Sequence, residues 1–89
     1  MMNDVLPLSA LKHNFKHLAV KPAFYQPDGA RQRVWTWEEV EKAVRSLIGG
    51  LHDLGVGKGD AVAIYGKNSA EWIIADWAVM LAGMVSIPI

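Results

Sequence analysis

Cysteine is absent from this 89-residue sequence, so disulfides and thiolate metal sites are excluded. Nine basic and nine acidic residues cancel, and no cluster of lysine or arginine stands out. The electrostatic signature of a protein that binds nucleic acid or anionic lipid is therefore missing. The start of the chain also lacks the basic residues and the apolar core of a secretion signal. A cytoplasmic protein without a nucleic-acid partner is the simplest expectation.

Charge is scarcest in residues 61–89, where only Lys67, Glu71 and Asp76 are charged. Hydrophobic residues make up 52% of the chain and glycine adds eight more, above the ~45–50% that both supply together in soluble domains. The helix expected over residues 70–82 carries apolar residues on nearly all of its faces, as helices in a protein interior do. That helix is too short to span a bilayer, which needs ~20 apolar residues. We expect this stretch to lie inside a larger protein body.

The same stretch predicts a strand, a helix and a second strand. Ala61–Tyr65 is an apolar run of strand length, and Met84–Ile87 is a second one. Asn68 or Ser69 can cap the intervening helix, and a glutamate three residues after Asn68 gives capping-box spacing. Gly83 can end the helix in the left-handed conformation. This is the pattern of a βαβ unit, whose strands are normally buried on both faces.

The first third of the chain predicts a short helix and a small hairpin. Strands are expected over Ala23–Gln26 and Arg31–Trp35, joined by a turn at Pro27–Gly29. The polar start of the second strand suits the edge of a sheet. An amphipathic N-terminal helix precedes them, with apolar residues at helical spacing: Leu8, Leu11, Phe15 and Leu18.

A long amphipathic helix follows the hairpin. Thr36 and Glu39 have capping-box spacing at its start, and Gly55 can end it. Gly49 and Gly50 each cost ~1 kcal/mol relative to alanine inside a helix, so we expect another backbone to approach them closely. An apolar stripe on this helix is predicted to pack on the sheet: Val40, Ala43, Val44, Leu47, Ile48, Leu51 and Leu54.

No catalytic or metal-binding set can be assembled from these residues. His13 and His17 have the spacing of two metal ligands on a helix, but zinc needs at least a third protein ligand, and solvated histidines are the simpler interpretation. The glycines at 55, 57 and 59 leave a helix and enter a strand, opposite to a dinucleotide-binding loop. Residues 66–69 lack the serine or threonine that follows the lysine of a P-loop. The helix N-terminus there can still attract an anion.

Four stretches taken together resemble a known family. They are Val34–Val40, Leu51–Asp60, Ala61–Trp72 and Ala82–Pro88. In order and spacing they resemble the opening of the AMP-forming acyl-CoA synthetases of the adenylate-forming ligase superfamily, and most of all the long-chain fatty-acid members. The resemblance implies an α/β fold in which residues 1–89 are part of the large layered N-terminal domain. This part stops after the second strand of the βαβ unit and includes no second domain.

The resemblance also implies a ligase that joins a fatty acid to coenzyme A through an acyl-adenylate made from ATP with Mg²⁺. The family's catalytic, cofactor-binding and metal-binding motifs would fall beyond residue 89, so none is assigned here and the 89 residues alone are expected to be inactive. Expected partners are the rest of the ligase chain and, through exposed apolar surface, a second copy. Acyl chain length, the acceptor and peripheral membrane association stay open. The alternative is a stand-alone α/β binding module with a phosphate near Ser69.

Overall fold

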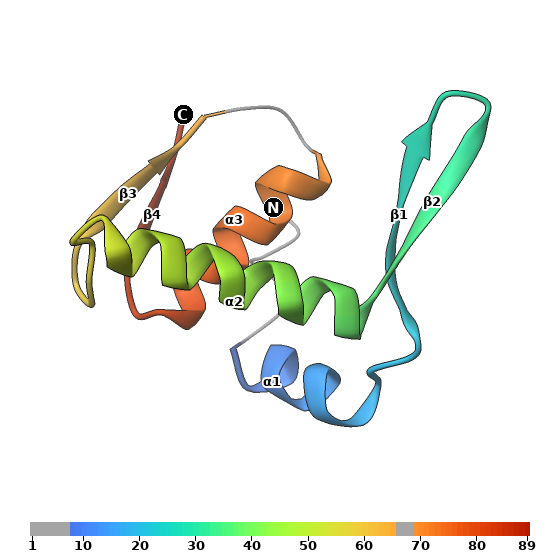
Figure 1. Cartoon of the computed structure of the whole chain (residues 1–89), viewed down its shortest axis with the longest axis horizontal. Coiled ribbons are helices and arrows are strands. Elements are labelled where there is room, and N and C mark those ends of the chain that lie inside the picture. Colours follow the sequence, from blue (N-terminus) through green and yellow to red (C-terminus); the bar gives the residue numbers. More distant parts are fainter. Residues whose placement is uncertain (1–7, 66–68) are drawn as a thin grey trace. The chain divides into compact units, whose positions relative to one another are not determined.

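The computed structural model describes residues 8–65 and 69–89. They divide into two compact units, the first ending at Lys42 and the second beginning at Ala43. No helix in the described ranges is both long enough and apolar enough to cross a membrane. The elements confirm the predicted α/β class (Figure 1), and in chain order they are α1 (Leu8–His17), β1 (Pro22–Asp28), β2 (Arg31–Thr36), α2 (Trp37–Asp53), β3 (Ala61–Ile64), α3 (Ala70–Leu81) and β4 (Val85–Pro88).

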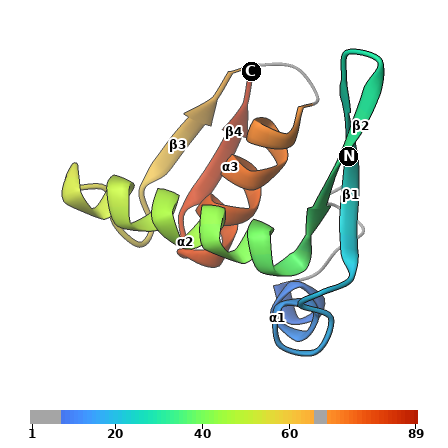
Figure 2. The same ribbon diagram turned by 45° about the vertical axis from the view of Figure 1, so that its right-hand side comes forward.

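In the second unit, β3 and β4 form a parallel pair connected by α3, which confirms the predicted βαβ unit. Ala61 lies opposite Val85 and Ile64 opposite Pro88. The strands run side by side in both views (Figures 1 and 2). A parallel pair needs a long crossover, which α3 supplies. The predicted bounds differ by one residue at a few ends, because strand pairing begins at Val85 and stops before Tyr65.

The core of this unit is a cluster of four buried side chains, Ile64, Trp72, Val79 and Met84. They come from β3, α3 and the residue just before β4, so the cluster lies between the helix and one face of the sheet. Leu51 and Val56, at the end of α2 and just after it, pack against the same cluster. The predicted apolar stripe of α2 therefore reaches the core of the βαβ unit through its last turn.

Both α2 and α3 end in the same hydrogen-bonded motif around a left-handed glycine. Gly55 has φ +87 and Gly83 has φ +76, as their predicted role requires. The amide of Val56 donates to the Leu51 carbonyl at 3.0 Å. The amide of Met84 likewise donates to Val79 at 2.9 Å. These bonds, from an amide to the carbonyl five residues earlier, are typical of a Schellman motif, which satisfies carbonyls at the helix end.

One face of the β3–β4 pair is open in this chain. Val85 and Ile87 alternate with Ser86 along β4 and are 53% and 46% exposed. Ser86 bonds to α3, so Val85 and Ile87 lie on the opposite face of the strand. Among the described residues α3 covers one face of the pair, so the predicted burial on both faces depends on segments outside them.

The predicted hairpin is present as the antiparallel pair β1–β2, with its turn displaced by two residues. Pro27 and Asp28 pair with Gln32 and Arg31 instead of forming the turn. The turn is Gly29–Ala30, with Gly29 at φ +61. Glycine can occupy this left-handed conformation without steric cost, so the turn forms there rather than at the proline.

The start of α2 confirms the predicted capping box. The Thr36 amide donates to Glu39 Oε1 at 3.0 Å, and the Glu39 amide donates to Thr36 Oγ1 at 3.3 Å. These two reciprocal bonds satisfy donors that a helix N-terminus would otherwise leave unpaired. Within the same unit, the ring of Phe15 in α1 packs edge-on to Trp37, with 6.1 Å between ring centroids. Both side chains are buried.

Two expectations for α2 are wrong. A Cβ added at Gly49 or at Gly50 would meet no described atom within 4 Å, so no other backbone approaches either glycine. Leu54 is 81% exposed, because the helix ends at Asp53 and the chain turns before the apolar stripe is complete. Both departures leave α2 with more open surface than its sequence pattern predicts.

Candidate functional site

The most strongly constrained polar group of the second unit is Asp76, in the middle of α3. Its side chain is 1% exposed, although aspartate is among the residues least often buried. The Ser86 hydroxyl donates to Asp76 Oδ1 at 2.7 Å. This short bond links α3 to β4 across the buried side of the sheet. Sequence reasoning treated Asp76 as one of three charges in an apolar stretch and did not find its partner.

The second carboxylate oxygen, Asp76 Oδ2, has no hydrogen-bond partner among the described residues and is fully buried. A buried carboxylate with one oxygen unpaired is costly, so the bond from Ser86 is important for holding the group in place. Solvent does not reach this carboxylate in the described part of the chain. We assign it a structural role that ties the helix to the strand.

The carboxyl ends of β3 and β4 lie where open α/β sheets commonly bind ligands. Ser69 is the N-cap of α3 there, and its Oγ accepts the Trp72 amide at 3.2 Å. Of the two predicted caps, Ser69 is therefore the one observed. Asn68 and its predicted capping box lie outside the described residues. One amide of the helix start, that of Trp72, is therefore already bonded to Ser69.

The glycine-rich connector uses its amides internally. The Gly57 amide donates to Asp60 Oδ2 at 2.7 Å. The Gly59 amide donates to the Gly83 carbonyl at 2.9 Å. A phosphate-binding loop must instead present free amides to its ligand. The interpretation of residues 55–59 as a connector is confirmed, and the loop fixes where β3 begins relative to the end of α3.

His13 and His17 lie one turn apart on α1, with 4.6 Å between ring centroids and both side chains exposed. Across the described ranges, no group of three or more His, Cys, Asp or Glu side chains is placed to hold a metal ion. Both histidines are exposed on the surface of α1, as the interpretation of solvated histidines predicts.

Comparison with protein families gives a match to the model described as "AMP-binding enzyme" over residues 11–89. A curated relative, long chain acyl-CoA synthetase 3 of Arabidopsis thaliana, is 43% identical over 61 residues, covering 67% of this chain and 9% of the relative. The long-chain-fatty-acid–CoA ligase FadD15 of Mycobacterium bovis is 39% identical over 59 residues, covering 63% of this chain and 10% of the relative. The chain thus spans about a tenth of the length of these relatives.

A solved structure shares the fold. The fatty acyl-adenylate ligase of L. pneumophila, solved in complex with acyl adenylate and pyrophosphate, superposes with a TM-score of 0.83 at 18% identity. The match covers 92% of this chain and 14% of the ligase chain. At this identity the comparison establishes the fold alone. The chain therefore shares its fold with a segment of a much longer chain.

Proposed function

Because the chain belongs to the family of AMP-binding enzymes, we propose that it is the N-terminal part of a ligase that activates a long-chain fatty acid and transfers it to coenzyme A. The 43% identity to a long chain acyl-CoA synthetase is the observation that carries the choice of substrate. The resemblance of the stretch from Tyr65 to Trp72 to long-chain members supports the same choice.

The proposed reaction has two steps. The fatty-acid carboxylate attacks the α-phosphorus of ATP, which forms the acyl-adenylate and releases pyrophosphate. The coenzyme A thiol then attacks the acyl carbon, which forms the thioester and releases AMP together with the thiol proton. In this proposal ATP, Mg²⁺ and coenzyme A are bound by other parts of the ligase, as the family resemblance implies.

In this proposal the 89 residues form part of the structural framework that supports the catalytic and substrate-binding residues of the ligase. The open face of β4, with Val85 and Ile87, would pack against further segments of the ligase chain. The length of the relatives supports this, since about nine-tenths of each lies outside the matched region. When the 89 residues are alone, the same apolar face would pair with a second copy.

A pyrophosphate-release assay tests the role of the isolated chain. The 89-residue protein is incubated with ATP, magnesium and palmitate, and a full-length long-chain acyl-CoA synthetase is the positive control. We expect no release above background, because no catalytic set is assembled in the described residues. Palmitate-dependent release by the isolated chain would contradict a purely structural role.

A chimera tests the function of the parent. Residues 11–89 replace the matching segment of the Arabidopsis long chain acyl-CoA synthetase 3, and palmitoyl-CoA formation is measured beside acetyl-CoA formation. We expect the chimera to keep the palmitate activity of the unmodified synthetase. A chimera that folds, as judged by circular dichroism and size exclusion, but activates neither acid would overturn the proposed assignment to this class of ligase.

A further inference from the structure

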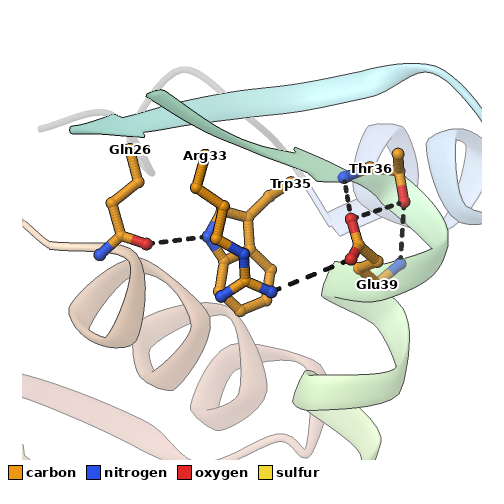
Figure 3. A network of polar contacts seen from close by, with 5 residues as sticks. All are labelled: Gln26, Arg33, Trp35, Thr36 and Glu39. Atoms are coloured by element: carbon orange, nitrogen blue, oxygen red, sulfur yellow. Dashed lines mark hydrogen bonds and ion pairs between the residues drawn. The ribbon is translucent and has the colours of Figure 1, made fainter. Parts of the chain in front are cut away.

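A chain of side-chain contacts links the β1–β2 hairpin to the first turn of α2, entirely within the first unit (Figure 3). It begins at Gln26 on β1 and passes through Trp35 and Arg33 on β2. It ends at Glu39 on α2, which also bonds to Thr36 at the junction of β2 and α2. We call these five residues the hairpin clasp.

Trp35 is held by three neighbours. Its Nε1–H donates to Gln26 Oε1 at 3.0 Å. The ring of Phe24 stacks on it with 5.8 Å between centroids. The Arg33 guanidinium carbon lies 3.6 Å from its ring centroid, which is close contact for a cation–π pair. Arg33 thus lies over the indole ring, and this contact restricts the rotamers from which it can pair with Glu39.

The two carboxylate oxygens of Glu39 make different contacts. Oε1 accepts from the Thr36 amide at 3.0 Å and from the Thr36 hydroxyl at 3.2 Å, which caps the helix. Oε2 faces Arg33 Nη2 at 3.9 Å, which reaches back to the hairpin. The cap requires only an acceptor, which glutamine also supplies. The tie to Arg33 requires the negative charge.

We infer that ionised Glu39 acts as a releasable tie that fixes the hairpin against the first turn of α2, separately from its role as a helix cap. When the charge is removed by Glu39→Gln, Arg33 and the hairpin arms become freer, while the side-chain oxygen of glutamine can still accept the bonds of the cap. In this inference a single carboxylate sets how firmly the hairpin arms are held against the helix. The base of the hairpin stays anchored by backbone bonds, since the Trp37 amide donates to the Lys21 carbonyl at 3.1 Å.

The direction of the pH dependence follows from the contacts. The hydrogen bond from the Thr36 backbone lowers the pKa of Glu39 below its ordinary value of 4.5, with smaller contributions from the Thr36 hydroxyl, Arg33 and Lys42, opposed by partial desolvation. A carboxyl whose pKa is lower in the folded state stabilises that state above its unfolded pKa. The contribution is lost as pH falls through the folded value. The tie is thus closed at neutral pH and opens below pH 4.5.

Hydrogen exchange measured by mass spectrometry at neutral pH tests the separation of tie from cap. In Glu39→Gln we expect amide exchange in residues 22–36 to rise by up to about five-fold, the range expected for an exposed ion pair. Exchange in residues 43–53 of α2 should stay at the wild-type rate. Glu38→Gln is the matched control, since it removes a charge from the same turn and should leave the hairpin unchanged. Equal hairpin exchange in Glu39→Gln and wild type, or equal acceleration of hairpin and helix, would overturn the inference.

A second measurement follows the Trp35 indole. In protein labelled with ¹⁵N-tryptophan, the Trp35 Nε1–H resonance is assigned with Trp35→Phe and followed from pH 7 to pH 3. We expect it to shift with a midpoint below 4.5 in the wild type and in Asp28→Asn, which removes the carboxylate at the end of β1 and leaves Glu39 in place. In Glu39→Gln the shift should vanish. An indole signal that is flat in the wild type, or that titrates unchanged in Glu39→Gln, would contradict the tie.

Discussion

At the scale of single residues, the bond between Asp76 and Ser86 has the greatest consequence for the βαβ unit. Asp76 is buried and keeps only one of its two oxygens paired with a described residue. The pair also connects residues ten positions apart, on two elements whose contact defines the fold. Loss of the donor would leave the whole carboxylate without a partner in a site that water does not reach.

We therefore expect Ser86→Ala to lower the free energy of unfolding by about 1–3 kcal/mol, the usual cost of an unpaired buried polar group. Urea denaturation monitored by circular dichroism measures the change. Ser86→Thr keeps the hydroxyl and should recover most of the loss. Ser46→Ala, at an exposed position of α2, should leave stability nearly unchanged. A Ser86→Ala variant as stable as the wild type would show that the bond contributes nothing net.

The sequence could not reveal this pair. The spacing of apolar residues places Asp76 on a helix that is apolar nearly all round, and there a lone acid is equally consistent with a solvated gap in the apolar surface. Its partner lies on another element, so only the fold brings the two side chains together. Thr36 and Glu39 are different, because both members of their capping box lie within one turn and the spacing alone identifies the contact.

At the scale of elements, the ends of α2 and α3 follow from local chemistry. The capping box, the two left-handed glycines and the parallel pairing were all predicted from short-range signals, and each is present. The turn of the hairpin was predicted at the wrong residues because Pro27 and Gly29 both favour turns. The turn that forms is the two-residue loop at Gly29–Ala30. The prediction for Gly49 and Gly50 was wrong because the sequence shows the helix-propensity cost of glycine but does not show which atoms lie near it.

Glycine substitutions separate these cases. Gly83→Ala should destabilise the protein by about 1–2 kcal/mol, because alanine resists the left-handed conformation. Its Cβ would also lie 3.2 Å from Lys58 Cγ, although that flexible side chain can move. Gly49→Ala and Gly50→Ala, in a helix with open space around them, should each stabilise by about 0.5–1 kcal/mol. Thermal unfolding of the three variants tests the contrast, and a loss of stability in Gly49→Ala would indicate an undetected close contact.

The cap of α2 gives a third prediction. Thr36→Ala removes the hydroxyl that accepts the Glu39 amide and should cost about 1 kcal/mol. Thr36→Ser, which keeps the hydroxyl, is the matched control. The loss should appear as a lower denaturant midpoint with an unchanged slope, since the surface exposed on unfolding stays the same. An unchanged midpoint would count against the helix start at Trp37.

At the scale of the whole molecule, the apolar excess seen in the sequence has a structural counterpart. Val85 and Ile87 remain about half exposed on the open face of the sheet among the described residues, and the chain matches only about a tenth of the length of its relatives. The sequence predicted that residues 61–89 belong in an interior. The face of the β3–β4 pair that stays uncovered is the one opposite α3. Local sequence patterns do not specify on which face α3 packs.

The open face yields a prediction about oligomeric state. Light scattering after size exclusion at micromolar concentration should give a mass above that of the 9.8 kDa monomer. Val85→Thr combined with Ile87→Thr should shift the mass toward the monomer, because the substitutions keep β-branched residues while reducing the apolar surface. Leu54→Thr is the control, since Leu54 is 81% exposed but lies outside the sheet. Association that survives the double substitution, or that Leu54→Thr abolishes, would place the contact elsewhere.

The two helix stops have one further consequence. The apolar residues that flank them, Leu51 with Val56 and Val79 with Met84, all belong to the same cluster or pack against it. Each helix therefore terminates where its last turn meets a shared interior, and neither stop is independent of the other. An excised peptide of residues 37–59 would keep its glycine but lose the partners of Leu51 and Val56, so its final turn should fray. In the intact chain, melting of the sheet and unravelling of both helix termini should be a single event.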